Sequence, residues 1–220
     1  MTAAPLSPAT HSVDIDGVPT ALPIIALDET LAIALLMVID MGVRFGERVG
    51  AALAARLAGP APEIVVGTAT LGIPVAIEVT RHLGLDQYVV IQKSPKTHLR
   101  DALMEEVRSV TSAGLQRLLL DRRALPKLRG RRVVVVDDVV ATGSSLAATL
   151  RLVRAAGAEI VGIGVILTEG QAWREVLGED AGLVSALGHI PQFRIAGGRA
   201  VVVEGTEESS FSEEKEAKRL

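Results

Sequence analysis

Short apolar runs alternate with helical patterns through the middle of the chain, between about residues 31 and 167. The runs have the length of buried strands, whereas a membrane span needs about 20 apolar residues. The pattern therefore predicts strands and no membrane-spanning segment. They are expected at Leu31–Ile39, Glu63–Val66, Tyr88–Gln92, Val107–Thr111, Arg117–Leu120, Arg132–Val136 and Ile160–Leu167.

Between these runs, apolar residues recur every three or four positions, as they do on the buried face of a helix. Phe45, Val49 and Leu53 form one such series, which Gly59-Pro60 would end. Two further helices are predicted, from Gly72 to about Leu83 and from about Ser144 to Ala156.

Strands and helices in alternation are typical of an α/β fold with a doubly wound, mostly parallel sheet. The continuous β-branched run Arg132–Val136 indicates a strand buried on both faces, which is the rule in such sheets. Ligands bind there at the carboxyl ends of the strands. Candidate chemistry is therefore expected directly after Val66, Gln92 and Val136.

The two ends of the chain are predicted to lie outside this domain. Residues 1–20 are polar and contain three prolines, so a loose N-terminal arm is expected before a domain at residues 21–203. Residues 204–220 carry six Glu against three Lys or Arg, which predicts a charged, disordered tail.

Composition and charge narrow the possible functions. The chain has no cysteine and only four scattered histidines, which argues against a disulfide scaffold, a cysteine nucleophile and a protein-held transition metal. The net charge is −3 and aromatic residues make up 2%, so nucleic-acid binding is not expected. No Lys or Arg precedes Arg44, so we expect no targeting signal and a cytoplasmic location.

Basic residues are concentrated between Lys93 and Arg132, where eleven Lys or Arg stand against four Asp or Glu. A basic segment on an acidic protein suggests a localised site for a polyanionic small molecule. A solvated basic face explains the same charge distribution equally well.

The segment Val133–Ser145 carries the most specific chemistry. A buried strand delivers Asp137 and Asp138 to its exposed end, and a loop of small residues, Ala141–Ser145, then opens a helix. The N–H groups and hydroxyls of this loop suit a phosphate monoester. The carboxylates would repel a phosphate but suit sugar hydroxyls or a ligand-held metal. A sugar phosphate satisfies both halves.

These thirteen residues resemble the phosphoribosyl-pyrophosphate (PRPP) signature of type I phosphoribosyltransferases, and the resemblance extends over about residues 20–195, most nearly toward the adenine enzymes. It implies that Asp137 and Asp138 hold the ribose hydroxyls, and it assigns the 5-phosphate to Ala141, Thr142, Gly143, Ser144 and Ser145. It also implies Mg²⁺ bound mainly through PRPP, in keeping with the habit of this ion of binding substrate phosphates.

Two further loops resemble the diphosphate-binding part of the family's site. Thr70, Leu71 and Gly72 align with the pyrophosphate loop, where adenine-specific members usually have an arginine in place of Leu71. Lys93 matches a family lysine and would neutralise the leaving diphosphate, whereas Gln92 replaces the family's arginine. Residues 94–106 correspond to a flexible loop that closes over the reaction centre, from which Lys96 or Arg100 could reach the diphosphate.

The base is less well specified. Val139 and Val140 would form an apolar floor, under a small hood made by residues around Val13–Ile25 and by the segment after Gly188. Ala141 stands where 6-oxopurine enzymes often have an acid, which matches the adenine pattern but does not exclude xanthine. Trp173 is interpreted as a packing residue rather than a base-stacking one.

The resemblance implies a glycosyltransferase of purine salvage that converts adenine and PRPP to AMP and pyrophosphate. A xanthine enzyme is one alternative. The other is a PRPP-binding regulator without catalysis, because Leu71 and Gln92 both remove charge from the diphosphate site. Family members usually dimerise, and the apolar stretch Leu22–Ala26 could contribute to a homodimer interface.

Overall fold

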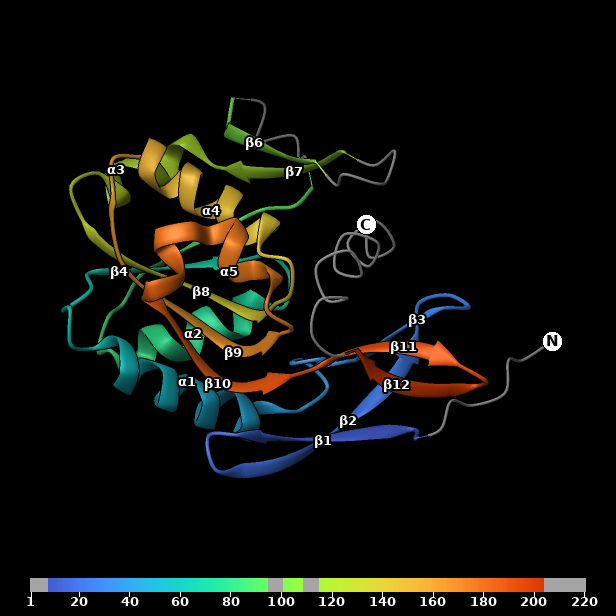
Figure 1. Cartoon of the computed structure of the whole chain (residues 1–220). Coiled ribbons are helices and arrows are strands. Elements are labelled where there is room, and N and C mark those ends of the chain that lie inside the picture. Colours follow the sequence, from blue (N-terminus) through green and yellow to red (C-terminus); the bar gives the residue numbers. More distant parts are fainter. Residues whose placement is uncertain (1–7, 95–100, 109–114, 204–220) are drawn as a thin grey trace.

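The computed structural model describes residues 8–94, 101–108 and 115–203. They form a parallel sheet covered by helices on both faces, beside a smaller antiparallel sheet (Figure 1). This is the predicted α/β architecture. The predicted tail, and Lys96 and Arg100, lie outside the described residues.

The central sheet has five parallel strands in the order β10-β9-β8-β4-β5. Their bounds are Val184–Ile190, Glu159–Glu169, Arg132–Val140, Ile64–Thr68 and Tyr88–Ile91. β8 lies in the middle and continues four residues beyond the predicted end at Val136, so Asp137 and Asp138 belong to the strand itself. Strand alternation places Val133 and Val135 on one face and Val134 and Val136 on the other, and all four are fully buried.

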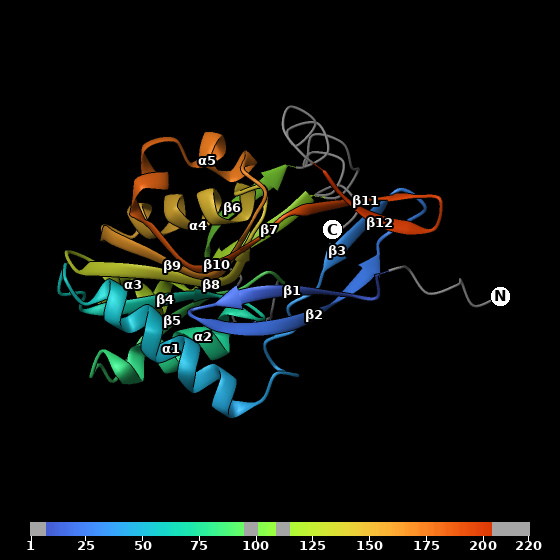
Figure 2. The ribbon, with the colours of Figure 1, turned by 60° about the horizontal axis from the view of Figure 1, so that its bottom comes forward.

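Each face of this sheet has its own core. Helices α1 (Val43–Leu57) and α2 (Gly72–His82) cover one face, and α4 (Ser144–Ala155) and α5 (Ala172–Leu177) cover the other (Figure 2). Short helical segments α3 (Leu125–Leu128), η2 (Arg122–Ala124) and η3 (Gly178–Leu183) complete the second side. Trp173 is 3% exposed in this second core, which confirms its interpretation as a packing residue.

The smaller sheet is the predicted hood, and it joins both ends of the domain. Its antiparallel order is β1-β2-β3-β11-β12, with bounds Thr10–Ile15, Val18–Ala26, Leu31–Ala34, Gln192–Ala196 and Arg199–Val203. Strand β3 ends at Ala34, so the predicted strand to Ile39 is too long. β10 leads into β11 through Pro191, which takes the chain directly from the central sheet into the hood.

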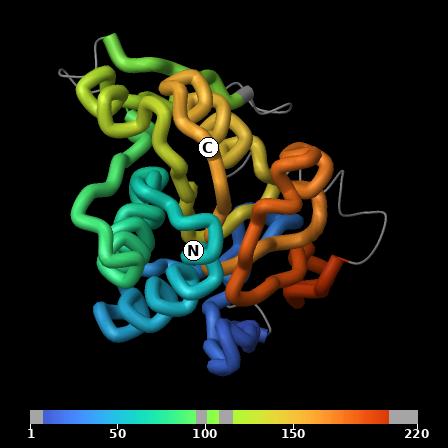
Figure 3. The backbone as a smooth tube through the Cα atoms, turned by 90° about the vertical axis from the view of Figure 1, so that its left-hand side faces the viewer, coloured from blue at the N-terminus to red at the C-terminus, as the bar shows by residue number. Residues whose placement is uncertain are grey.

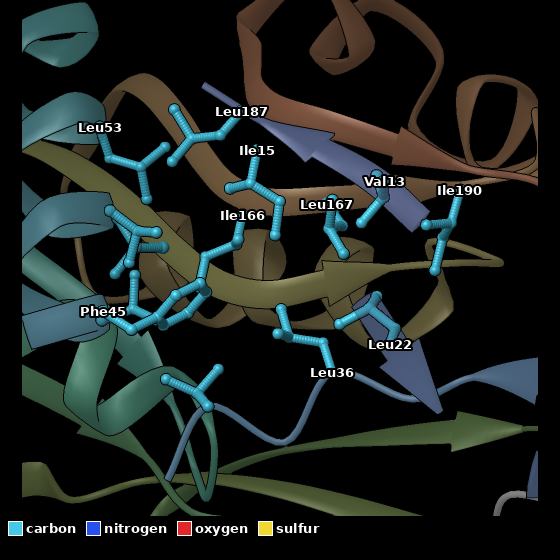
Figure 4. Close-up of a cluster of buried hydrophobic side chains, with 14 of the residues drawn as sticks. Val13, Ile15, Leu22, Leu36, Phe45, Leu53, Ile166, Leu167, Leu187 and Ile190 are labelled. Carbon is cyan, nitrogen blue, oxygen red and sulfur yellow. The ribbon is translucent and has the colours of Figure 1, made fainter. Parts of the chain in front are cut away.

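The prediction of a loose arm over residues 1–20 is wrong for residues 10–20. β1 and the start of β2 pair around a tight turn in which Asp16 and Gly17 have φ values of 54° and 80°. Positive φ at both central residues is the signature of the favoured two-residue hairpin turn. Val13 and Ile15 of this hairpin pack into the first core, Ile15 beside Leu187 and Val13 near Leu167 and Ile190 (Figure 4). The polar residues of this segment lie on the exposed face of a strand whose other face is buried, so composition alone did not indicate the strand.

The hairpin is also tied to the central domain by polar contacts. Asp16 N–H donates to the Leu187 carbonyl at 3.0 Å, and Arg48 Nη1 donates to the Ile15 carbonyl at 2.8 Å. Arg56 pairs with Asp16 at 2.7 Å. These bonds hold one end of the hood against α1 and β10 of the central domain.

The stretch Leu22–Ala26, expected to contribute to a dimer interface, is partly buried within the chain itself. Leu22 is fully buried and Ile24 is 6% exposed, and both belong to the first core. Pro23, Ile25 (42% exposed) and Ala26 remain exposed.

A second hairpin lies on the far side of the central domain from β1 and β2 (Figure 3). Its strands β6 (Leu103–Arg108) and β7 (Leu115–Leu120) are antiparallel. The prediction of a loop over residues 94–106 is therefore wrong for residues 103–106. These residues form a strand because β7 pairs with them, a contact that the local sequence does not show.

Candidate functional site

One cavity of about 380 Å³ opens at the carboxyl ends of the central strands. The fold rule for ligand sites in parallel sheets predicts this position. Most of the predicted site residues line it: Thr70, Leu71, Lys93, Asp137, Asp138, Val139, Val140, Ala141, Thr142, Gly143 and Ser145. Three segments that are far apart in sequence, at residues 70–71, 93 and 137–145, therefore meet at one place.

The loop after β8 forms a helix N-terminus at one side of the cavity. Gly143, with φ of 87°, precedes α4, and Ser144 is the first residue of that helix. Ser144 N–H donates to Thr142 Oγ1 at 3.4 Å, and the two hydroxyl oxygens are also 3.4 Å apart. Because the first N–H groups of a helix lack internal partners, this loop can bind an anion.

Gly143 is required by its conformation and by its neighbour. A Cβ at this position would lie 3.1 Å from Trp173 Cα and 3.2 Å from the Trp173 carbonyl oxygen. Trp173 is itself fixed, because its indole N–H donates to the Gly170 carbonyl at 3.2 Å. The buried tryptophan thus packs against the loop Ala141–Ser145, a contact that the sequence did not indicate.

Asp137 and Asp138 lie side by side at the end of β8. Asp138 N–H donates to Asp137 Oδ1 at 3.0 Å. Burial, and then the charge of Asp138, raise the pKa of Asp137 well above its ordinary value, with Lys93 opposing this rise. The pair therefore favours ligands that relieve the repulsion, such as hydroxyl donors or a cation.

Gly72 brings the second loop against these carboxylates. A Cβ on Gly72 would lie 2.7 Å from Asp137 Oδ1, so a side chain there would displace the carboxylate. Thr70 and Leu71 precede it at the start of α2 and line the cavity, and the peptide between Ala69 and Thr70 is cis. Lys93, just past the end of β5, completes the wall.

The cavity also includes residues that the sequence analysis did not single out. Ile33, Ala34, Leu35 and Leu36 contribute an apolar wall from the end of β3, at the junction of hood and central domain. In the sequence these residues belong to the apolar run that begins at Leu31, and that run predicts only a buried strand. Val13–Ile25, expected in the hood over the base, supports this wall from β2 rather than lining the cavity.

Gln116 is the other addition. It reaches the cavity from β7, and Ser145 Oγ donates to Gln116 Oε1 at 3.3 Å. A neutral residue inside a basic segment gave no signal in the sequence. Ala69 and Leu146 also line the cavity.

In the part of the chain that the structure describes, including the cavity, no group of three or more His, Cys, Asp or Glu could hold a metal ion. Within the same residues, no helix is both long enough and apolar enough to cross a membrane.

Comparison with known proteins agrees with this geometry. The family model described as "Phosphoribosyl transferase domain" matches residues 47–191. Xanthine phosphoribosyltransferase 1 of Clostridium perfringens is 30% identical over 146 residues, covering 66% of this chain and 75% of that protein. An orotate phosphoribosyltransferase of Staphylococcus saprophyticus is 34% identical over 108 residues, covering 49% of this chain and 43% of that protein.

Solved structures give the same fold. Adenine phosphoribosyltransferase from Thermoanaerobacter pseudethanolicus aligns with a TM-score of 0.64 at 20% identity, over 77% of this chain and 95% of that one. The enzyme from Rhodothermus marinus aligns with a TM-score of 0.61 at 21% identity, over 84% and 96% of the two chains. The family model covers more than half of the sequence, and its match includes both the β8 carboxylates and the phosphate loop. The chain therefore belongs to the phosphoribosyltransferase family.

Proposed function

We propose that the protein transfers the 5-phosphoribosyl group of PRPP to a purine base, with adenine as the preferred base. The observation that carries the proposal is the single cavity that combines two adjacent carboxylates, a helix N-terminus and Lys93. PRPP has ribose hydroxyls, a phosphate monoester and a diphosphate. These match the carboxylates, the helix N-terminus and Lys93 of the cavity, respectively.

At one end, the loop Ala141–Ser145 would bind the 5-phosphate through backbone N–H groups and hydroxyls. Next to it, Asp137 and Asp138 would accept hydrogen bonds from the ribose 2- and 3-hydroxyls. A carboxylate pair suits vicinal hydroxyls because each oxygen accepts, and hydroxyl donors stabilise the charge that burial disfavours at Asp137.

At the other end, Lys93 would neutralise the departing diphosphate, with backbone donors from Thr70 to Gly72 beside it. The carboxylate pair also fits Mg²⁺ carried in by PRPP, because a cation relieves the repulsion that raises the pKa of Asp137. When bound, Mg²⁺ would neutralise diphosphate charge.

The reaction breaks the bond between ribose C1 and the diphosphate oxygen, and the bonding electrons leave with the diphosphate. A purine ring nitrogen attacks C1 from the opposite face, which inverts the configuration, and the nitrogen proton is released. The protein forms no covalent bond in this step. It positions the two reactants and stabilises charge, and both effects can supply much of the rate.

Support for adenine comes from the wall of the base end. Val139, Val140 and Ile33–Leu36 are apolar, and Ala141 brings no acid to meet a 6-oxopurine. These side chains offer no charged group to a 6-oxopurine, which favours adenine.

Xanthine is the second candidate, because curated xanthine enzymes are 30% identical to this chain. The test is pyrophosphate release from PRPP and Mg²⁺ with adenine, hypoxanthine, guanine, xanthine and orotate in parallel. Release with adenine alone supports the proposal. Release with xanthine alone keeps the mechanism and overturns the base.

The same assay separates catalysis from PRPP sensing. If no base gives pyrophosphate while PRPP still raises the melting temperature, the protein binds PRPP without consuming it. The matched control is the double variant Asp137→Asn, Asp138→Asn, which should keep the fold and lose turnover by orders of magnitude. An active double variant would refute the assigned site.

A further inference from the structure

The β6–β7 hairpin is fixed against the helix that begins at the phosphate loop. Leu118 and Leu120 of β7 are fully buried in the core shared with α4. Arg151 of α4 donates from Nε to Glu105 Oε2 of β6 at 2.9 Å. The hairpin and the helix therefore hold a defined position relative to each other.

Strand alternation places Gln116 on the same face of β7 as Leu118 and Leu120. Gln116 lies two residues before Leu118, at the end of the strand that meets the start of α4. At this end of the strand the Gln116 side chain lines the cavity, next to Ser145 in the first turn of α4, whereas Leu118 and Leu120 pack in the core.

The hydrogen bond between these two side chains uses the single hydroxyl proton of Ser145. Ser145 Oγ donates it to Gln116 Oε1 at 3.3 Å, so in this arrangement the serine has no proton left for an anion. The Gln116 amide brings two N–H donors to the same place. Among the described residues that line the cavity, Lys93 is the only cation. Binding of an anion at the α4 end therefore depends on neutral hydrogen-bond donors, and the loss of one donor should weaken it.

We propose that Gln116 is a further binding residue for the 5-phosphate of PRPP, contributed by the β6–β7 hairpin rather than by the phosphate loop. When the phosphate binds, Ser145 turns its proton to a phosphate oxygen, and a Gln116 amide N–H donates to the same phosphate. The inference rests on the proposed function, since it extends the site assigned there.

The experiment measures binding by calorimetry, so it is independent of turnover and of the acceptor base. Ribose 5-phosphate probes the α4 end of the cavity, and inorganic pyrophosphate probes the Lys93 end. Gln116→Leu keeps the size of the side chain and removes its donors. Gln116→Ala is the second variant, and the melting temperature of each reports folding. Arg151→Gln is the matched control, because it loosens the hairpin outside the cavity.

Gln116→Leu is expected to raise the Kd of ribose 5-phosphate about 10-fold, the usual effect of one hydrogen bond to a charged group, and to leave that of pyrophosphate within about 2-fold. Arg151→Gln should change neither. The proposal is overturned if Gln116→Leu and Gln116→Ala bind ribose 5-phosphate as the wild type does, or if Arg151→Gln weakens it equally. If the wild type itself binds no ribose 5-phosphate, the proposed function fails first and this inference with it.

Discussion

Replacing Gly143 with alanine is expected to destabilise the protein and to weaken PRPP binding, although only one methyl group is added. Gly143 has φ of 87°, a conformation that L-residues disfavour. The new Cβ would lie 3.1 Å from Trp173 Cα, 3.2 Å from its Cβ and 3.2 Å from its carbonyl oxygen. Two of these three atoms are backbone, so rotation of the tryptophan side chain cannot relieve the contact.

The two costs can be estimated separately. The left-handed conformation costs an alanine about 1 kcal/mol relative to glycine. Forcing a methyl group into close contact with a packed segment adds about 1–3 kcal/mol. We therefore expect the free energy of unfolding to fall by about 3 kcal/mol, which lowers the melting temperature by about 6–12 °C in a chain of this size.

Gly84→Ala is the matched control, because Gly84 has φ of 70° and a Cβ added there would have no atom within 4 Å. It carries only the conformational cost, so its melting temperature should fall by about 2–4 °C. Thermal unfolding of both variants, with and without PRPP, checks the reasoning. The stabilisation by PRPP should shrink in Gly143→Ala and stay unchanged in Gly84→Ala. Equal effects of the two substitutions would refute the role assigned to the Trp173 contact.

Three further changes test the electrostatics of the site. Burial raises the pKa of Asp137, so the folded protein keeps a proton that the unfolded chain releases above about pH 4, and stability falls as pH rises from there through the raised pKa. Asp137→Asn removes this pH-dependent loss of stability. The melting temperature of the variant should therefore exceed that of the wild type by an amount that grows from pH 4 to pH 8, while activity is lost. A difference that is the same at every pH would contradict the raised pKa as the cause. Leu71→Arg supplies a cation at the diphosphate end and should tighten pyrophosphate binding about 10-fold at low salt, with a smaller effect at high salt; a salt-independent change would count against charge as the reason. Lys93→Gln should weaken pyrophosphate binding about 10-fold or more while ribose 5-phosphate binding changes little, and calorimetry with both ligands distinguishes this from a general loss of the site.

The local order of the central domain was predictable from sequence. Apolar runs and glycine stops located α1, α2 and α4, and the β-branched run Arg132–Val136 identified the central strand. The carboxylates and the loop that line the cavity were also predictable, because they lie in one continuous segment, Asp137–Ser145. These helices, this strand and this segment depend on residues that are close together in the chain, so their pattern can be recognised from the sequence alone.

The hood and the second hairpin were harder to predict, because their strands bury one face and their partners are remote. Residues 10–20 are polar enough to suggest an arm, yet Val13 and Ile15 are buried in the same core as Leu187. Leu103–Glu106 continue as a strand because β7 pairs with them. In both cases the deciding contact lies outside any local window.

By itself, the sequence predicted the α/β class, the order of the central elements and, through the family resemblance, that Asp137, Asp138 and the loop Ala141–Ser145 belong to one site. Only the tertiary structure decided that Ile33–Leu36 and Gln116 join the same cavity, that Trp173 supports Gly143, and that burial beside Asp138 raises the pKa of Asp137. The physical reason is the same for all three. Burial, close approach and electrostatic coupling depend on distances between segments, and folding sets those distances.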